Sequence, residues 1–229
     1  MKLSCLQEKL NRGLGIVGRA VATRTTLPIT NNVLLAADQS RIKLVATNLE
    51  MAISYWINGP ETKVEEEGEI TVPARLLTEF VNSLPNEQID INLPPRTKTL
   101  GLKCGRSEAR ISGVDAKDFP PIPKVDDGIT TSIEVAAIRE GISHVAFAAA
   151  TEESRPVLTG VDALFEGDVL TLAAADGFRL AVYKLPLAAP VSARVEVIIP
   201  ARTLGELNRL IGDGEETINI TVNASKGQI

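Results

Sequence analysis

Hydrophobic side chains recur at helical spacing near the start of the chain and again 128 positions later. The first stripe consists of Leu10, Leu14, Val17 and Ala20. The second stripe consists of Ile138, Ile142, Val145 and Ala148. Apolar positions three or four residues apart line one face of an α-helix, so the pattern predicts amphipathic helices over about 7–22 and 135–149.

Runs that alternate between apolar and polar residues follow each of these helices, with turn residues between the runs. They cover 33–37, 42–46 and 51–57 in the first half, and 160–165, 169–174 and 180–185 in the second. Period-2 alternation of this kind predicts antiparallel hairpins. Further strands are expected at 2–6, 88–93, 100–103, 108–112, 130–134 and 217–222. A second helix in each half is predicted to start at Pro73 or Pro200, because proline fits the first helical position.

The chain is therefore an internal repeat. The segment Ile70–Leu84 recurs as Val197–Ile211, and the proline-containing stretch Asp115–Gly128 separates the copies. We predict an α+β fold of tandem domains, each with two helices packed on antiparallel β-sheets. The expected boundaries are 1–117 for domain 1, 118–128 for a linker and 129–229 for domain 2. Domain 2 lacks counterparts of the strands at 100–112, so we expect it to be incomplete at its C-terminal end.

Composition narrows the functional class. The chain is 44% hydrophobic and 23% charged, has a formal net charge of −5, and shows no apolar run of membrane-spanning length. Cys5 and Cys104 lie far apart without zinc-site spacing, so we expect reduced thiols in a cytoplasmic protein with no membrane partner. The acidic residues cluster in predicted turns, whereas arginines lie on or beside the helices. The acidic clusters are Glu65–Glu67, Asp126–Asp127 and Glu215–Glu216.

The sequence offers little support for an enzyme. His144 is the only histidine, and it lies in a predicted helix, so we expect no catalytic residue, no metal site and no cofactor. Gly13–Gly18 matches the G-x-G-x-x-G pattern of dinucleotide-binding folds, with Asp38 twenty residues later. However, the repeat keeps the apolar stripe and replaces two of the three glycines. A nicotinamide-dependent oxidoreductase therefore stays a minor alternative, which a test of NAD binding would decide.

Seven segments in order resemble the bacterial DNA sliding clamp, the beta subunit of DNA polymerase III. They are Arg24–Ile29, Ala46–Met51, Thr71–Arg75, Cys104–Ser107, Ala116–Pro120, Ala174–Val182 and Ile198–Arg202. The resemblance covers the first two of the family's three domains; the third is absent from this chain. It implies a non-enzymatic processivity factor that encircles duplex DNA during DNA replication. The implied partners are double-stranded DNA, the DNA polymerase III alpha subunit, other polymerases, the clamp loader and a second copy in a head-to-tail dimer ring. The alternative is a two-domain clamp that forms trimers, as archaeal and eukaryotic rings do.

The resemblance also implies two sets of site residues. Those expected nearest the DNA are Arg24, Arg75, Arg155 and Arg202. Arg12 and Arg19 are expected on the outer face of the first helix, and any of these arginines could instead be an ordinary solvated side chain. Half of the family's partner-peptide cleft is expected at Leu158, Ala175, Gly177, Phe178, Arg179 and Leu180. Phe178 departs from the polar residue typical of the family. The alternative for Leu158 and Leu180 is ordinary strand core.

Overall fold

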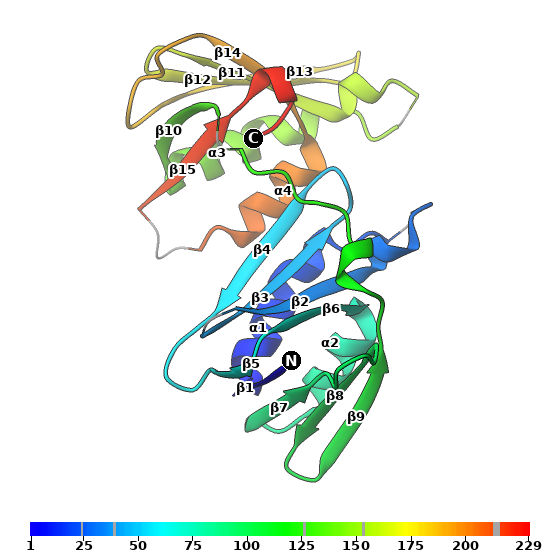
Figure 1. Ribbon diagram of the computed structural model, residues 1–229. Coiled ribbons are helices and arrows are strands. Elements are labelled where there is room, and N and C mark those ends of the chain that lie inside the picture. The colour runs from blue at the N-terminus through cyan, green and yellow to red at the C-terminus, as the bar shows by residue number, and fades with distance from the viewer. Residues whose placement is uncertain (24, 39, 126, 153, 213–215) are drawn as a thin grey trace. The chain divides into compact units, whose positions relative to one another are not determined.

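The computed structural model divides into two compact units, Met1–Ile122 and Pro123–Ile229 (Figure 1). It describes residues 1–23, 25–38, 40–125, 127–152, 154–212 and 216–229. Each unit combines α-helices with antiparallel sheets, which confirms the predicted α+β class. The finer division into 1–117, 118–128 and 129–229 stays a prediction.

Unit 1 contains two antiparallel sheets and two α-helices. One sheet has the order β5 (Lys63–Glu66), β1 (Lys2–Leu6), β7 (Gln88–Asn92), β8 (Thr99–Cys104), β9 (Ser107–Ser112). The other has the order β4 (Ala52–Ile57), β3 (Arg41–Thr47), β2 (Asn32–Asp38), β6 (Gly68–Pro73). The helices are α1 (Gln7–Val17) and α2 (Ala74–Ser83), which contact each other; α1 also lies against β3 and β4.

Unit 2 repeats this plan in part. Its four-stranded sheet has the order β13 (Leu180–Pro186), β12 (Val169–Ala175), β11 (Gly160–Glu166), β14 (Val195–Pro200). A two-stranded sheet pairs β10 (Ile129–Glu134) with β15 (Thr217–Val222). The helix α3 (Val135–Val145) packs on β12 and β13, and α4 (Ala201–Leu210) contacts α3 (Figure 1). The strand order 13-12-11-14 matches 4-3-2-6 of unit 1, so the repeat in the sequence is a repeat of topology.

One glycine of the G-x-G-x-x-G match, Gly13, serves packing. Gly13 lies in the middle of α1, where an added Cβ would stand 2.8 Å from Leu44 Cδ1 and 2.9 Å from Tyr55 Cδ1. Its counterpart Gly141 faces the corresponding side chains of unit 2, with Leu172 Cδ1 at 3.2 Å. An added Cβ at Gly15 would meet no atom within 4 Å. The glycine that the repeat keeps is thus the one that lets the helix approach the sheet.

Several predicted boundaries are wrong. The helix α1 ends at Val17 and tightens into a 3-10 turn, η1 (Gly18–Ala20), so exposed Arg19 does not lie on the α-helix with Arg12. Likewise α3 ends at Val145 and continues as η4 (Ala146–Ala148). Pro73 closes strand β6, paired with Asn32, and the helix starts one residue later. Pro73 has the backbone angles φ −54° and ψ 114°. The ψ value is not helical, so Pro73 belongs to the end of the strand.

Three strands were not anticipated: β5, β6 and β14. Glu65 and Glu66 therefore lie in an edge strand rather than in a turn. Asp126 and Glu215 lie outside the described residues. A loop runs beside β10, where Ala188 N–H donates to Ser132 O at 2.8 Å. This loop takes the place along β10 that β5 takes along β1.

The chain after β9 extends the second sheet of unit 1. Thr71 N–H donates to Val114 O at 3.1 Å, and Val114 N–H donates to Thr71 O at 2.8 Å. Thr71 corresponds to Ile198 in unit 2. Within the described part of unit 2, no segment pairs with Ile198 in this way. In unit 2, β14 instead contacts the 3-10 turn η6 (Ala224–Lys226), which is a structural difference between the repeats.

Candidate functional site

A tight turn between β12 and β13 presents the central residues of the expected cleft. Asp176 Oδ1 accepts hydrogen bonds from the backbone N–H groups of Phe178, at 2.9 Å, and Arg179, at 3.0 Å. Asp176 Oδ2 accepts a third hydrogen bond, from Arg179 Nε at 2.9 Å. These bonds, the one from Phe178 first, hold the pKa of Asp176 below its usual value. Gly177 completes the turn at φ +92°, a conformation that glycine adopts without strain.

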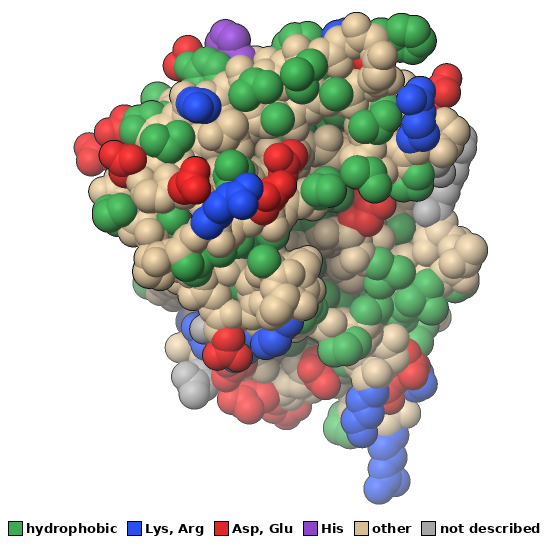
Figure 2. Space-filling model, turned by 90° about the horizontal axis from the view of Figure 1, so that it is seen from above, with side chains coloured by type: hydrophobic (Ala, Val, Ile, Leu, Met, Phe, Trp, Pro, Cys, Tyr) green, Lys and Arg blue, Asp and Glu red, His purple; other side chains and the backbone are tan. Residues whose placement is uncertain are grey.

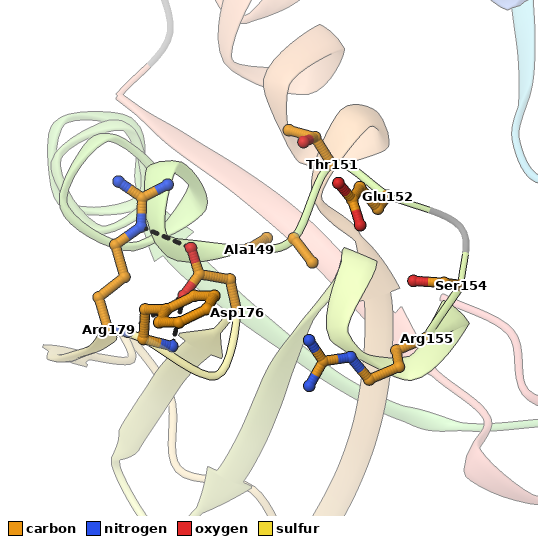
Figure 3. A pocket seen from close by; sticks show the side chains of 9 residues that line it. Ala149, Thr151, Glu152, Ser154, Arg155, Asp176 and Arg179 are labelled. Carbon is orange, nitrogen blue, oxygen red and sulfur yellow. Dashed lines mark hydrogen bonds and ion pairs between the residues drawn. The ribbon is translucent and has the colours of Figure 1, made fainter.

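A pocket of about 180 Å³ opens beside this turn (Figure 3). Its walls come from the segment after η4 and from the turn itself. The lining residues are Ala149, Ala150, Thr151, Glu152, Ser154, Arg155, Asp176, Phe178 and Arg179. The side chain of Arg155 turns toward Gly177, where an added Cβ would stand 3.2 Å from Arg155 Nη1. Arg155 forms no ion pair with the described residues, so its charge is available to a ligand in the pocket.

The structure brings together two of the six expected peptide-cleft residues as pocket lining, Phe178 and Arg179. The others flank it. Ala175 and Leu180 are a cross-strand pair at the ends of β12 and β13. Leu158 is half-buried in the 3-10 turn η5 (Pro156–Thr159). Leu180 is 69% exposed, so it is not the strand core that the alternative interpretation required.

The sequence reasoning missed one aromatic residue of this region. Phe147 is 59% exposed, and the guanidinium of Arg179 lies over its ring at 5.6 Å from the centroid. The scarcity of aromatic residues in the chain was the signal that could have drawn attention to Phe147. Arg155, expected near DNA, lines the pocket, and its contact with DNA stays a prediction. Phe178, 95% exposed, leaves a large apolar side chain beside two arginines.

The outer face of the four-stranded sheet in unit 2 continues this apolar surface. Figure 2 looks onto the side of the molecule where that sheet lies and shows hydrophobic side chains gathered among charged ones. Val182 and Ile198 are about half exposed, in the same cross-strand row as Asp162. Asp162 Oδ1 is buried and accepts no hydrogen bond from the described residues, and burial raises the pKa of this carboxyl. In unit 1 the corresponding residue is the apolar Leu34.

The arginines expected near DNA occupy matched positions on the second helices. Arg75 and Arg202 are each the second residue of their helix, α2 and α4, and both are exposed. Arg75 Nε donates to Glu79 Oε1 at 2.7 Å, and this hydrogen bond raises the pKa of Arg75. Arg202 has no ion pair with the described residues. Arg24 lies outside the described residues.

Two family models divide the chain between them. The DNA polymerase III beta subunit, N-terminal domain, matches residues 1–123, and the central domain of the same subunit matches residues 132–229. The chain belongs to the DNA polymerase III beta subunit family. This membership confirms the resemblance seen in the seven ordered segments. The alternating hairpins and duplicated helices are thus the N-terminal and central domains of that family.

Known beta subunits are similar to this chain over nearly its whole length. The beta sliding clamp of Synechocystis sp. is 36% identical over 97% of this chain and 61% of its own length. The sliding clamp of Bacillus subtilis has a TM-score of 0.92 at 28% identity, covering 97% of this chain and 60% of that chain. The DNA polymerase III subunit beta of Pseudomonas aeruginosa has a TM-score of 0.88 at 33% identity, covering 96% and 59%. The chain therefore spans about three fifths of the length of these relatives.

The described residues contain neither a membrane-spanning helix nor a metal-binding cluster. None of their helices is long and apolar enough to cross a membrane. They also contain no group of three or more His, Cys, Asp or Glu side chains placed to hold a metal ion. His144 is exposed on α3, stacks on Tyr183 at 5.0 Å between ring centroids, and has Nδ1 2.8 Å from Glu140 O. The Ser143 hydroxyl lies 3.4 Å from His144 Nδ1 and donates to Glu140 O at 2.8 Å.

Proposed function

We propose that this chain forms two domains of a sliding clamp, a non-catalytic processivity factor that encircles duplex DNA and tethers a replicative polymerase. The observation that carries the proposal is the match of two successive domains of one family over residues 1–123 and 132–229. A ring links protein to DNA by topology, so it needs no reading of base sequence. Fast, electrostatic contacts to phosphate suffice and permit sliding.

Arg75 and Arg202 are proposed to supply such contacts. They are exposed and stand at corresponding positions of the two repeats, so the helix of each unit presents its arginine at the same position, the second residue. A net charge of −5 is compatible with this role because part of the acidic charge, at Glu65 and Glu66, lies in an edge strand and not on the helices. Arg24 is proposed as a third contact from its sequence position alone. For Arg155 the pocket geometry favours a contact with peptide over one with DNA.

The pocket beside the Asp176 turn is proposed to bind short peptide segments of partner proteins. Its apolar parts are Phe178 and, at its edge, Leu180 and Leu158, which suit aliphatic or aromatic anchors. Arg155 and Arg179 provide donors for peptide carbonyl or carboxylate groups. The proposed partners are the DNA polymerase III alpha subunit, other polymerases and the clamp loader, which would compete for one site.

Self-association is proposed to use strand edges. Within the described residues, β9 in unit 1 and β13 in unit 2 each have a free outer edge. An exposed edge is a template for pairing with another chain, and a closed ring satisfies all such edges. We propose a head-to-tail dimer ring for the protein at the length of its relatives. Mass measurement in solution distinguishes this from a two-domain trimer, since a stable trimer of the 229-residue chain would overturn the dimer.

The proposal can be tested with a chimaera in which this chain replaces the matching part of the Bacillus subtilis clamp. The chimaera is loaded onto a nicked circular plasmid by the Bacillus subtilis clamp loader. We expect it to stay bound to the circle and to be released when a restriction enzyme linearises the DNA. The unaltered Bacillus subtilis clamp serves as the control. If a chimaera with the mass of a dimer stays bound to linearised DNA as well as it does to circular DNA, topological linkage is refuted.

A further inference from the structure

The turn at Asp176 has a counterpart in unit 1 that forms without an arginine. Asn48 Oδ1 accepts hydrogen bonds from the backbone N–H groups of Glu50, at 3.0 Å, and Met51, at 2.8 Å. These two bonds correspond to the two that Asp176 Oδ1 accepts, and Met51 stands where unit 2 has Arg179. One acceptor oxygen is therefore enough to build the turn. The Arg179 side chain and the second oxygen of Asp176 are not needed for it.

The guanidinium of Arg179 is held from two directions. Its Nε donates to Asp176 Oδ2 at 2.9 Å (Figure 3), and its Cζ lies over the ring of Phe147, 5.6 Å from the ring centroid. Phe147 belongs to η4, so the two contacts come from separate segments of unit 2. The Nη1 and Nη2 atoms form no hydrogen bond with the described residues. These two donors are thus left for a ligand.

Packing does not explain why residue 147 is aromatic. The side chain of Phe147 is 59% exposed, and its counterpart in unit 1 is the exposed Arg19. Positions 147 and 179 differ together between the repeats, because unit 1 has Arg19 and Met51 there, whereas unit 2 has an aromatic ring in contact with an arginine. A cation–π contact attracts the guanidinium to the face of the ring, and it restricts a side chain that otherwise has many rotamers. The ring therefore orders a group that lines the pocket.

The charged side chains that line the pocket are two positive and two negative: Arg155, Arg179, Glu152 and Asp176. Asp176 is already paired with Arg179. Glu152 forms no ion pair with the described residues, so it would compete with a ligand for an arginine that moved freely. Because Phe147 and Asp176 hold Arg179 in place, its two unbonded donors stay available to a ligand. Two such donors match the two oxygens of a carboxylate, which accepts both in a bidentate pair.

We propose that Phe147 is a positioning residue of the pocket in unit 2, and that the pocket takes a peptide whose carboxylate binds Nη1 and Nη2 of Arg179. The carboxylate belongs to an acidic side chain or to the end of the peptide. Phe147 acts through Arg179, since its ring reduces the side-chain entropy that Arg179 would otherwise lose on binding. The inference rests on the proposed peptide site. It adds the chemical class of the ligand and a residue outside the pocket lining.

The test uses the full 229-residue chain and three fluorescein-labelled hexapeptides, each with two leucines. The first has two aspartates and a C-terminal amide. The second has two asparagines and a C-terminal amide, and the third has two asparagines and a free C-terminal carboxylate. Fluorescence anisotropy measures the affinity of each peptide. We expect a carboxylate peptide to bind more tightly than the asparagine amide, and the one that does so identifies the source of the carboxylate.

Phe147→Leu should weaken binding of that carboxylate peptide by roughly two- to fivefold, the effect of a cation–π contact at an exposed site. Phe147→Tyr keeps the ring and should retain the affinity of the unaltered chain. Arg179→Ala should weaken binding of the same peptide about tenfold, since a charge-assisted hydrogen bond is lost. With Arg179→Ala already present, Phe147→Leu should have no further effect, because Phe147 acts only through Arg179.

Trp56→Leu is the matched control. It removes another exposed ring that contacts a cation, because Lys43 Nζ lies 5.4 Å from the centroid of Trp56 in unit 1. This variant should leave the affinity for every peptide unchanged. Thermal melting verifies that each variant is folded.

The role of Phe147 is overturned if Phe147→Leu binds the carboxylate peptide as tightly as the unaltered chain does. It is also overturned if the loss persists in full beside Arg179→Ala, or if Phe147→Tyr loses as much affinity as Phe147→Leu. Each of these results, with the effect of Arg179→Ala intact, leaves the peptide pocket standing. Carboxylate peptides that bind no more tightly than the asparagine amide would overturn the ligand class. If no peptide binds the unaltered chain, the pocket is refuted, and the role of Phe147 with it.

Discussion

Arg155 lies across Gly177, with its Nη1 atom 3.2 Å from the point where a Cβ of residue 177 would stand. The two residues belong to different loops, one before β11 and one between β12 and β13. The guanidinium thus lies close to the backbone of the turn, so the pocket has a positive group beside it in the absence of a ligand. Such preorganisation lowers the entropy cost of binding.

Gly177→Ala should damage peptide binding more than stability. The new Cβ would crowd Arg155 and would stand at φ +92°, so we expect a loss of roughly 1 kcal/mol in the free energy of unfolding. Displacement of Arg155 should weaken binding of a fluorescein-labelled hexapeptide with two leucines and two aspartates about tenfold, the worth of one charge-assisted hydrogen bond. Calorimetry and anisotropy measure the two effects separately.

Gly167→Ala provides the matched control for that variant. Gly167 also has a positive φ, +59°, but an added Cβ there would meet no atom within 4 Å. It should cost a similar amount of stability and leave peptide affinity unchanged. Equal loss of affinity in both variants would show that general loosening of the sheet, and not displacement of Arg155, is responsible.

The turn at Asp176 predicts a dependence on pH. The hydrogen bond from Phe178 N–H, together with those from Arg179, holds the pKa of Asp176 below its unfolded value. A depressed pKa stabilises the fold above the unfolded value of about 3.9, and this contribution is lost as pH falls through the folded pKa. The melting temperature of the unaltered chain should therefore drop more steeply below about pH 4 than that of Asp176→Asn.

Asn48 of unit 1 shows why asparagine is the appropriate replacement. It accepts the same two backbone hydrogen bonds without a charge. At neutral pH Asp176→Asn should thus retain the turn and lose only the ion pair with Arg179. Asp176→Ala should lower the melting temperature further, because the backbone N–H groups of Phe178 and Arg179 would lose their acceptor. Identical melting curves for the two variants would contradict this account of the turn.

The periodicity of hydrophobic residues predicted the strands and helix faces that bury one apolar side. The alternating runs located six of the hairpin strands, and the apolar stripe located the buried face of α1, because burial requires one face of each element to be apolar. The periodicity failed to predict strands whose position depends on tertiary contacts. Strand β5 consists largely of charged residues, and its place is set by pairing with β1 rather than by any pattern of its own.

The candidate site was likewise predictable only in part. The dipeptide Asp176–Gly177 announces a turn, and the position of Phe178 and Arg179 follows from it. The position of the Arg155 side chain could not be predicted from local sequence. It lies beside Gly177, which is 22 residues later in the chain, in space that a Cβ at residue 177 would crowd. Family resemblance named Arg155 for DNA contact. The loop packing placed it in the pocket.

Two glycines of one helix should respond in opposite ways to alanine. Gly13→Ala would place a Cβ 2.8 Å from Leu44 Cδ1, so we expect destabilisation by about 1–3 kcal/mol from overpacking. Gly15→Ala points into open space and should stabilise α1 by up to about 1 kcal/mol, because glycine is a poor helix former. Urea denaturation measures both. A phosphate-binding role would instead make both variants fold normally and lose nucleotide affinity.

Arg202 and Arg75 should differ in their contribution to DNA binding although they occupy matched positions. Each phosphate contact adds about one unit to the slope of log K against log salt concentration. Arg202 has no ion pair with the described residues, so Arg202→Ala should lower the slope by about one unit. The charge of Arg75 is partly neutralised by Glu79, so Arg75→Ala should lower the slope less. Fluorescence titrations of a DNA duplex at several salt concentrations give these slopes.

Arg194→Ala is the control for net charge. It removes the same charge from a side chain that already pairs with Glu196 at 3.0 Å and Glu166 at 3.9 Å. Arg194 directly precedes β14, whereas Arg202 follows the other end of that strand. The slope of Arg194→Ala should equal that of the unaltered chain. If Arg194→Ala and Arg202→Ala flatten the slope equally, the effect comes from total charge. The helices would then have no special part in holding DNA. A local contact between Arg202 and phosphate requires that the slope depend on where the charge is removed.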